Sequence, residues 1–291
     1  MEKVLKVLVT GCTGYIGSHL CKVLFEAGHI VTGLDIEWNK HNDVSKYIHR
    51  MLIKDVTRHV IDEDYDAIVH LAGYISVEES VLRPSLYYGC NIGGTSQLLK
   101  QPGNPHFIFA STAGAFDAQS PYARSKVAAE DIIKEKSKNY TIFRFFNVAG
   151  SNGEHRQVGR SSHLIRIAGE CAANKREKMY IYGEDYDTKD GTCVRDYIHV
   201  VDLVNAISNT IKHGSFNTPY ECIGSGNGYS VKEVIQTMKE VTGVDFKVET
   251  SNRRAGDPPS LAIDNQFKLL EPTLTLKDMC LSAYQAEKTR V

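Results

Sequence analysis

The sequence predicts an α/β fold in which a doubly wound parallel sheet is followed by a smaller C-terminal α+β substrate lobe, and three observations support this. Short apolar runs alternate with amphipathic stretches in the first half of the chain, as is typical of parallel strands joined by crossover helices. A glycine-rich turn separates the first strand from the first helix. The 291 residues, 42% of them hydrophobic, are enough for one such domain and a second lobe.

The predicted strands are short apolar runs separated by stretches with one polar face. One helix is expected near Ser18–Ala27, where Leu20 and Leu24 can face the sheet. Another is expected over Tyr122–Lys136, before the last strand of the sheet. The strands are expected at Val4–Thr10, His29–Leu34, Met51–Ile53, Ala67–Leu71, His106–Ala110 and Thr141–Phe145.

The pattern loosens after Ser151, where glycine, asparagine and basic residues become frequent. We therefore predict a dinucleotide-binding domain over residues 1–153, to which residues 190–220 return, and a discontinuous substrate lobe over residues 154–291. In the second lobe Gly243 stands where a helix should end. Helices are expected at Leu164–Ala173 and Val231–Thr242, and strand-like runs at Met179–Tyr182 and Phe246–Glu249.

Composition and charge argue against several classes of function. The formal net charge is −1, from 34 basic and 35 acidic residues without a long run of one sign, so no nucleic-acid partner is expected. The seven cysteines are scattered and never paired as C-x-x-C, which argues against disulfides or a metal site and favours reduced thiols in a cytoplasmic protein. No apolar stretch approaches the ~20 residues that cross a bilayer, so neither membrane insertion nor secretion is expected.

The turn after the first strand has the composition of a dinucleotide-binding loop. Gly11, Gly14 and Gly17 let the backbone approach a pyrophosphate, and Tyr15 and Ile16 lie where the turn becomes a helix. The start of that helix offers free amides and partial positive charge to an anion. The alternative interpretation is a glycine-rich turn that serves only tight packing.

Asp35 adds weight to the cofactor interpretation, because it ends the second predicted strand 18 positions after Gly17 (from 17 to 35). A carboxylate there accepts hydrogen bonds from the adenosine ribose and repels a 2′-phosphate. The strand, turn, helix and acid are all in register, which favours a Rossmann-like domain that binds NAD rather than NADP.

Tyr122 and Lys126 form a second candidate pair, because four positions place them one turn apart on a helix face. A free phenol has a pKa of about 10 and is a poor base at neutral pH, and a nearby cation favours its ionised form. Ser111 and Thr112 end the preceding strand, where sites on parallel sheets form, so one of their hydroxyls could share the proton of a sugar alcohol. The alternative is an ordinary surface Tyr-Lys pair.

Taken together, these residues resemble the extended short-chain dehydrogenase/reductase family. The shared segments are Thr10–His19 (TGCTGYIGSH), His70–Gly73 (HLAG), Ser111-Thr112, and Tyr122 with Lys126. Three further segments are similar to the UDP-glucose 4-epimerase branch: Arg144–Gly150 (RFFNVAG), Tyr182–Val200 and Arg253–Asp257 (RRAGD). The likeness runs nearly end to end and implies an NAD-dependent epimerase that acts on C4 of a UDP-hexose, with UDP-glucose and UDP-galactose preferred.

The resemblance also implies a role for each matching residue. Tyr122 is the base, Lys126 its electrostatic partner and a ligand of the nicotinamide ribose, and Thr112 the hydroxyl beside the sugar, with Ser111 a less favoured substitute. Further cofactor contacts are expected at Asp55, Val56, Leu71, Ala72, Gly73 and Asn91. The UDP contacts are expected at Asn147, Arg195 and Arg254 (diphosphate), Asp257 (ribose), Tyr180 and Tyr182 (uracil), and His163 and Leu164.

In the implied mechanism, NAD accepts a hydride from C4 while Tyr122 takes the proton of the 4-hydroxyl, and the hydride then returns to the opposite face of the sugar. Arginine suits the diphosphate because its planar fork of donors can meet two charges bidentately. The alternative for Arg195 is an ion pair with Asp190 or Asp196, and for Arg254 an ion pair with Asp257.

The chain departs from the family pattern between Thr112 and Tyr122, which are only ten positions apart (from 112 to 122), and at Ile75, where the epimerases carry a lysine.

Two competing functions remain. A catalytically idle sensor of NAD or sugar nucleotide would fit the shortened loops, and a 4,6-dehydratase would share the oxidation step. This chain lacks the carboxylates expected of a dehydratase, because Ala113 and Gly114 follow Thr112.

The family resemblance also implies a homodimer formed through helices near Ser85–Leu99 and Tyr122–Lys136.

Overall fold

The structure is a computed structural model that describes residues 3–58, 63–159, 162–214, 218–254, 256–262 and 272–289. It contains two compact units, Met1–Phe145 with Val204–Glu221, and Phe146–Leu203 with Cys222–Val291. The sequence analysis expected the boundary at residue 153 and the return at residues 190–220. The chain changes unit earlier because Asn147–Ala149 pairs with Tyr197–His199 instead of extending the large sheet.

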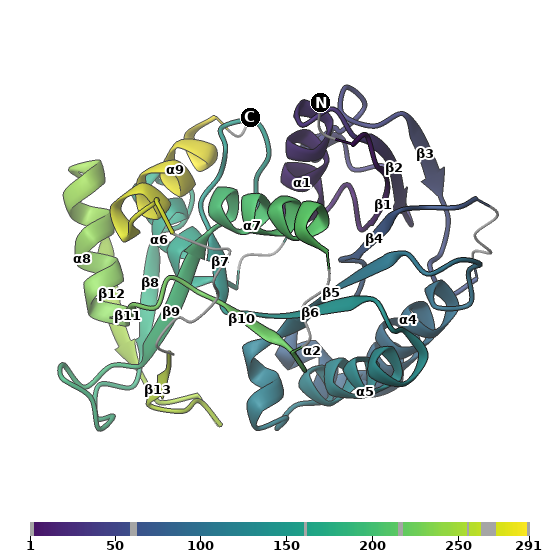
Figure 1. The fold of residues 1–291 in the computed structure, drawn as a ribbon. Coiled ribbons are helices and arrows are strands. Elements are labelled where there is room, and N and C mark those ends of the chain that lie inside the picture. Colours follow the sequence, from purple (N-terminus) through teal and green to yellow (C-terminus); the bar gives the residue numbers. More distant parts are fainter. Residues whose placement is uncertain are drawn as a thin grey trace. The chain divides into compact units, whose positions relative to one another are not determined.

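The first unit is built on a seven-stranded sheet in the order β10-β6-β5-β4-β1-β2-β3 (Figure 1). The pairs of β1 with β2 and β4, of β2 with β3, of β4 with β5 and of β5 with β6 are all parallel. Each of the six predicted strands is present with bounds shifted by two residues or fewer. The strands are β1 (Lys6–Thr10), β2 (Ile30–Asp35), β3 (Arg50–Ile53), β4 (Ala67–His70), β5 (His106–Thr112), β6 (Tyr140–Phe145) and β10 (Glu221–Ile223).

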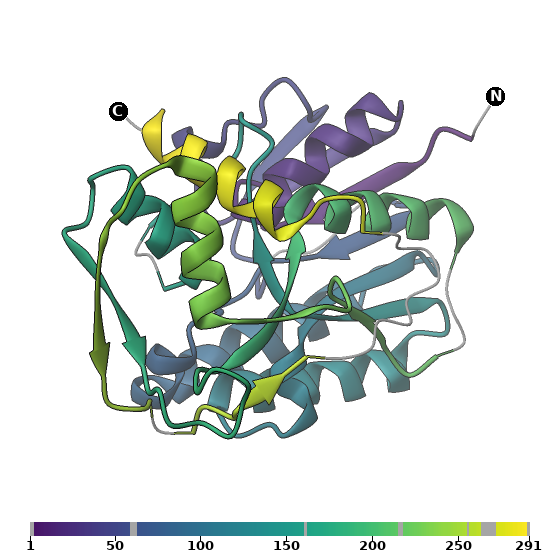
Figure 2. The same ribbon diagram turned by 90° about the vertical axis from the view of Figure 1, so that its left-hand side faces the viewer.

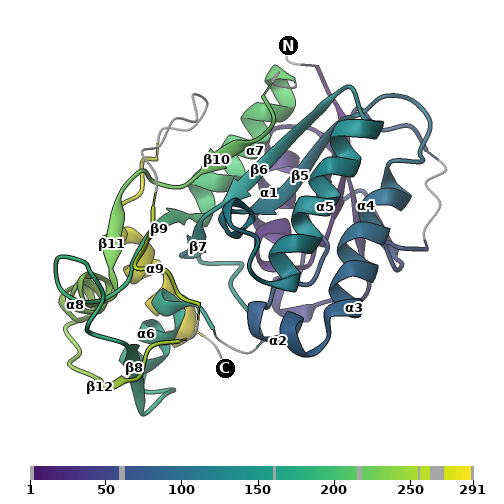
Figure 3. The same ribbon diagram turned by 90° about the horizontal axis from the view of Figure 1, so that it is seen from below.

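Helices cover both faces of this sheet, which confirms the doubly wound α/β prediction. Figure 3 shows α4 and α5 on one face of β5 and β6, with α1 and α7 on the other. The helices are α1 (Tyr15–Glu26), α2 (Val77–Leu82), α3 (Pro84–Tyr87), a π-helix (Tyr88–Ile92), α4 (Gly93–Leu98), α5 (Pro121–Lys136) and α7 (Val200–His213), with 3-10 turns at Lys40–Asn42 and Ala113–Phe116.

The hydrophobic core between α5 and the sheet explains why the sequence of β5 begins with an apolar run. Phe107 and Phe109 of β5 are each 1% exposed and pack against Ala129 and Ile133 of α5. Burying a side chain of this size stabilises the fold by about 1.5–3 kcal/mol. The helix is thereby held against β5, the strand that ends with the two hydroxyl residues.

Over the residues that the structure describes, the second unit has two small sheets and three helices. In one sheet β8 (Lys178–Tyr182) pairs with β12 (Lys247–Ser251); in the other β9 (Val194–His199) is flanked by β7 (Asn147–Ala149), β11 (Gly228–Ser230) and β13 (Ser260–Leu261). These helices are α6 (Leu164–Ala172), α8 (Val231–Thr242) and α9 (Leu276–Lys288). Figure 2 shows α9, in yellow, beside the light green α8.

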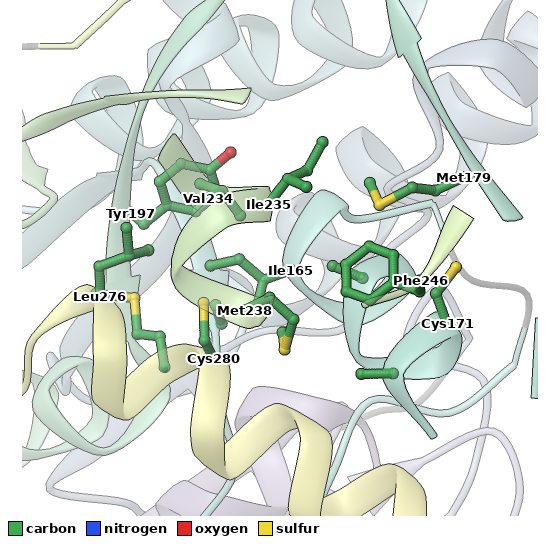
Figure 4. Packing of buried hydrophobic residues seen from close by; sticks show 14 of the residues in the cluster. Ile165, Cys171, Met179, Tyr197, Val234, Ile235, Met238, Phe246, Leu276 and Cys280 are labelled. Atoms are coloured by element: carbon green, nitrogen blue, oxygen red, sulfur yellow. The ribbon is translucent and has the colours of Figure 1, made fainter. Parts of the chain in front are cut away.

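Helix α8 has the predicted bounds because both of its ends carry stop signals. Ser230 and Glu233 form a capping box, and Gly243 adopts a left-handed φ of 67° after the last turn. Helix α9 was not predicted, yet it completes the core of this unit. Figure 4 shows Leu276 and Cys280 of α9 packed with Met238 of α8 and Ile165 of α6.

In the described parts of the chain, each helix is either too short or too polar to cross a lipid bilayer.

Candidate active site

The turn between β1 and α1 has a shape that excludes side chains. Gly11 has a φ of +70°, and a Cβ on it would lie 2.9 Å from the Ala72 amide nitrogen. A Cβ on Gly17 would overlap the Gly11 carbonyl oxygen. Gly14 is the N-cap of α1 and Tyr15 and Ile16 are its first two residues, so the first amides of the helix have no side-chain cap. The turn therefore fits a pyrophosphate held by backbone N–H groups.

Asp35 lies at the end of β2 beside this turn, as predicted. Its Oδ2 accepts hydrogen bonds from the Thr13 amide at 2.9 Å and from Thr13 Oγ1 at 2.8 Å. Its Oδ1 accepts from the Ile36 amide at 2.8 Å. These bonds hold the carboxylate rigidly at the sheet edge, where its remaining lone pairs suit ribose hydroxyls.

The backbone of Leu71, Ala72 and Gly73 forms the opposite side of the turn. The Leu71 amide donates to the Thr10 carbonyl oxygen at 3.2 Å, and the Ala72 amide donates to Thr10 Oγ1 at 3.2 Å. The chain after β4 is thus bonded to the end of β1, next to Gly11. This segment has the backbone placement expected beside a dinucleotide.

Two further predicted cofactor residues follow β3. The Asp55 carboxylate accepts from the amide and hydroxyl of Thr57 at 2.9 and 2.7 Å, and these bonds lower the pKa of Asp55. Val56 is buried, and its Cγ1 lies 2.8 Å from the place that a Cβ on Gly94 would take. Both residues belong to the same edge of the first unit as Asp35, which ends the neighbouring strand β2.

Asn91 lies in the π-helix and is fully buried. Its amide nitrogen donates to the Tyr74 carbonyl at 3.2 Å and to Ser125 Oγ at 2.9 Å, and its oxygen accepts from the Tyr74 amide at 3.1 Å. These bonds tie the loop after Gly73 to α5. Asn91 therefore shapes the predicted cofactor site through Tyr74 and Ser125.

Tyr122 lies in the first turn of α5, where the Ser120 side chain accepts a hydrogen bond from the Ala123 amide and Pro121 is the first helical residue. Burial raises the pKa of the Tyr122 phenol to about 12, and a hydrogen bond with the Thr112 side chain opposes that rise. Thr112 is the last residue of β5. The strand and the helix therefore bring the two predicted hydroxyl groups together.

Lys126 is on the same helix, 3% exposed, and its ammonium donates to the Ala110 carbonyl oxygen at 2.9 Å. The ammonium also lies 4.8 Å from the centre of the Phe109 ring. Burial lowers the pKa of Lys126 to about 8. The side chain that lowers the pKa of Tyr122 in the structure is that of Thr112.

Ser111 is engaged elsewhere. Its hydroxyl donates to Glu130 Oε1 at 2.5 Å on the side of the sheet covered by α5. This contact argues against Ser111 as a substitute for Thr112, since the hydroxyl already serves a buried carboxylate. Glu130 was missed in the sequence analysis, although it follows Lys126 by four positions, as Lys126 follows Tyr122, and this spacing could have revealed it.

Several of the predicted nucleotide contacts meet within the second unit. Arg195 of β9 pairs with Asp257 at 3.3 Å. Arg254 stacks on the Tyr182 ring, 4.0 Å from its centre. Tyr180 and Tyr182 both lie on β8, with ring centres 6.3 Å apart. This cluster of two arginines, two aromatic rings and a carboxylate has the composition expected for a nucleoside diphosphate site.

The ion pairs considered for Arg195 were wrong. Asp190 accepts from Thr192 and Ser230, and Asp196 accepts from Ser225 and Gly226, so neither carboxylate is its partner.

The remaining predicted contacts lie at the ends of elements of the second unit. Asn147 begins β7, and its side-chain amide donates to the Asp196 carbonyl oxygen at 3.1 Å. His163 is the N-cap of α6 and Leu164 its first residue. A helix start of this kind presents unpaired amides, in keeping with a contact to nucleotide.

Comparison with known proteins gives a consistent result. Residues 7–222 match the family described as the NAD dependent epimerase/dehydratase family. A UDP-glucose 4-epimerase of Halalkalibacterium halodurans is 36% identical over 89% of this chain and 87% of its own length.

Solved structures agree. The UDP-glucose 4-epimerase of Bifidobacterium longum in complex with NAD+ and UDP has a TM-score of 0.86 at 28% identity, covering 97% of this chain and 98% of that one. The UDP-Glc/GlcNAc 4-epimerase of Campylobacter jejuni has a TM-score of 0.79 at 35% identity, covering 98% and 99%. The chain therefore belongs to the NAD dependent epimerase/dehydratase family.

Proposed function

We propose that this protein is an NAD-dependent UDP-glucose 4-epimerase, which inverts C4 of a UDP-hexose through a 4-keto sugar. The observation that carries the proposal is the meeting of three groups beside the end of β5: the Thr112 side chain is near enough to the Tyr122 phenol to lower its pKa, and Lys126 is buried on the same helix. That arrangement provides a base, a hydroxyl that can relay the proton, and a cation. The 36% identical protein of Halalkalibacterium halodurans, a UDP-glucose 4-epimerase, supports the same activity.

The first unit is proposed as the cofactor domain, which the sequence places over residues 1–153. Gly11, Gly14, Gly17, Tyr15 and Ile16 would hold the pyrophosphate, and Asp35 the adenosine ribose. Asp55 and Val56 would lie beside the adenine, and Leu71, Ala72 and Gly73 beside the pyrophosphate. The bound NAD would supply a hydride acceptor and donor for C4 of the sugar.

In the proton step Tyr122 removes the proton of the 4-hydroxyl, beside or through Thr112, and returns it later. Burial raises the pKa of the Tyr122 phenol to about 12, so the phenol alone is protonated at neutral pH. A positively charged group placed near the phenol favours its ionised form. The Lys126 ammonium donates to the carbonyl oxygen of Ala110, two residues before Thr112 on the same strand.

The second unit is proposed as the UDP-binding lobe, which the sequence places over residues 154–291. Arg195, Arg254 and Asn147 would hold the diphosphate, Asp257 the uridine ribose, and Tyr180 and Tyr182 the uracil, with His163 and Leu164 as further contacts. Asp257 and Tyr182 hold the guanidinium groups of Arg195 and Arg254 in place, which supports this assignment.

The strand end disfavours dehydration. Elimination of water from a 4-keto sugar needs an acid and a base beside the hydroxyl, whereas Ala113 and Gly114 follow Thr112. Glu130 is a carboxylate of the same network, and it is bound by Arg144 and Ser111. We further propose that the protein is a cytoplasmic homodimer formed through the helices near Ser85–Leu99 and Tyr122–Lys136, which include α4 and α5.

The test is incubation of the purified protein with UDP-glucose, UDP-galactose and their N-acetyl counterparts without added cofactor, followed by separation of C4 epimers. We expect the first pair to interconvert, and the Tyr122→Phe variant to lose at least ~99% of the rate. Tyr65→Phe is the matched control, because this phenol bonds Glu63 in the same unit. If the protein retains NAD and UDP-sugar but converts nothing, it is a catalytically idle sensor. If the Tyr122→Phe variant turns over at the parent rate, Tyr122 is not the base.

A further inference from the structure

A buried ion pair joins the tyrosine-bearing helix to the sheet. Glu130 of α5 is fully buried, and Arg144 of β6 is 7% exposed. Arg144 Nε donates to Glu130 Oε1 at 2.9 Å and Nη2 donates to Oε2 at 2.8 Å, which is a bidentate pair. Desolvating two charges is costly, and an apolar pair of similar volume would often be as stable. The pair is therefore a candidate for a role beyond packing.

The ion pair reaches the residue directly before Thr112. Ser111 and Arg144 are register partners in the parallel pair of β5 and β6, and Ser111 Oγ donates to Glu130 Oε1 at 2.5 Å. One carboxylate oxygen thus receives both a serine hydroxyl and a guanidinium N–H. This shared bond fixes the carboxyl end of strand β5 against the middle of α5.

The same arginine also holds the segment after Thr112. The Arg144 guanidinium lies 3.8 Å from the centre of the Tyr220 ring and 5.0 Å from that of Phe116. The two rings meet edge to face at 5.9 Å. Phe116 ends the 3-10 helix that begins right after Thr112. The Arg144 guanidinium therefore holds the chain on both sides of Thr112: through Glu130 it holds Ser111, and by direct packing it holds Phe116.

On the helix side, Glu130 shares a face with the catalytic candidates. Tyr122, Lys126 and Glu130 follow each other at intervals of four, which places them one above another on α5. A shift of Glu130 relative to Ser111 would therefore move Tyr122 relative to Thr112.

We propose that Glu130 is a positioning residue of the epimerase, which acts through Ser111 and Arg144 to hold Thr112 within hydrogen-bond reach of Tyr122. This inference rests on the proposed function. Glu130 touches neither the sugar nor the cofactor in this role. Its contribution is to keep a proton-relaying hydroxyl and a phenol in line, where displacements of about 1 Å can lower rates by up to a hundredfold.

Ser111→Ala is the decisive variant, because it removes the hydroxyl link and leaves the ion pair in place. We expect kcat to fall on the order of tenfold while KM for UDP-glucose changes less than about twofold, since nucleotide binding is untouched. Glu130→Gln should lower kcat further. It also leaves Arg144 without a buried counter-charge and endangers folding, so the outcome for Ser111→Ala decides alone.

Thr141→Val is the matched control. Thr141 Oγ1 and His106 Nε2 form a buried hydrogen bond, 2.8 Å long, between the same two strands at their opposite ends. This variant loses a comparable buried bond, so we expect a similar fall in the midpoint of thermal unfolding but the parent's kcat. All rates are measured well below the unfolding midpoints and divided by the folded fraction.

The outcomes separate the two ideas. If the parent protein converts no UDP-sugar, the proposed function fails and this inference fails with it. If the parent is active and Ser111→Ala has the same kcat as Thr141→Val, the function stands and the network is only structural. A crystal structure of Ser111→Ala in which the distance between Thr112 Oγ1 and Tyr122 Oη is unchanged would also contradict the proposal.

Discussion

The Lys126 ammonium donates its hydrogen bond to the carbonyl oxygen of Ala110, at 2.9 Å, on the strand that ends two residues later with Thr112. The cation is therefore fixed to the strand, and the phenol of Tyr122 interacts with the hydroxyl of Thr112. In a simple Tyr-Lys pair the phenol and the ammonium would contact each other. Here each of them contacts a residue of β5 instead.

Replacing Thr112 by valine should raise the pKa of Tyr122, because the hydrogen bond that lowers it is lost. A higher pKa leaves less phenolate at a given pH, so we expect kcat at pH 7 to fall about tenfold and the rising limb of the pH profile to move to higher pH. Thr95→Val is the control, since its hydroxyl bonds the Asn91 carbonyl within a helix. An unshifted pH profile in Thr112→Val would contradict this account.

The buried Lys126 should make stability depend on pH. Burial lowers its pKa from the ordinary 10.5 to about 8 in the folded protein, so between these values the unfolded chain binds the extra proton and stability rises with pH. Below pH 8 the buried charge lowers stability by on the order of 3 kcal/mol relative to high pH. We expect Lys126→Met to gain most in unfolding free energy below pH 8, and its advantage to disappear by about pH 10.5. Denaturation of cofactor-free protein by urea at several pH values measures this difference, and a constant difference would refute it.

The dinucleotide turn should not tolerate a methyl group at Gly17. A Cβ there would overlap the Gly11 carbonyl oxygen, so the turn must open to accept it. We expect Gly17→Ala to lose at least about tenfold in NAD affinity, measured by calorimetry, with a lower unfolding midpoint. Gly89→Ala, where a Cβ meets nothing within 4 Å, should bind NAD like the parent. Equal affinity in the two variants would show that the turn does not hold the cofactor.

Ala118 carries a strained backbone in the shortened link before α5. Its φ is +49°, a left-handed conformation that glycine adopts more easily. Ala118→Gly should therefore stabilise the protein by about 0.5 kcal/mol, after the extra chain entropy of glycine is counted. Ala128→Gly within α5 should have the opposite sign and destabilise by about 1 kcal/mol. Chemical denaturation resolves both changes, and a loss of stability in Ala118→Gly would be the contrary result.

Arg254 should matter for the nucleotide more than its neighbour Arg253. Arg254 stacks on Tyr182, whereas Arg253 stacks on Tyr186 and bonds Asp185. We expect Arg254→Ala to weaken UDP binding by about ten to a hundredfold, since a charge-assisted contact to phosphate is lost. Arg253→Ala should change it less than about threefold. Titration of UDP against each variant gives the comparison, and the reverse order would assign the diphosphate to the other arginine.

Most of the sheet of the first unit could be predicted because its central strands are buried apolar runs between turn residues. Phe107 and Phe109, for example, lie on a strand covered on both faces, so the run has no polar interruption. The strand β10 could not be found in this way, because Glu221–Ile223 is only three residues long and pairs with a strand far away in the sequence.

The candidate site divides in the same manner. The glycine turn, Asp35 and the Tyr-Lys spacing are local patterns, and the chain places each where its spacing implied. The partners of Ser111 and Arg195 depend on contacts across 19 and 62 positions, which spacing alone does not encode. Ser111 therefore serves Glu130, and Arg195 pairs with Asp257 in place of Asp190 or Asp196.

Helix α9 supplies Leu276, Met279 and Cys280 to the core that α6 and α8 share. During synthesis on the ribosome, that core has an open side until residues 276–288 emerge from the exit tunnel. The second unit must then mature after translation of its own strands, and a nascent chain stalled before residue 276 should remain a target for chaperones and proteases.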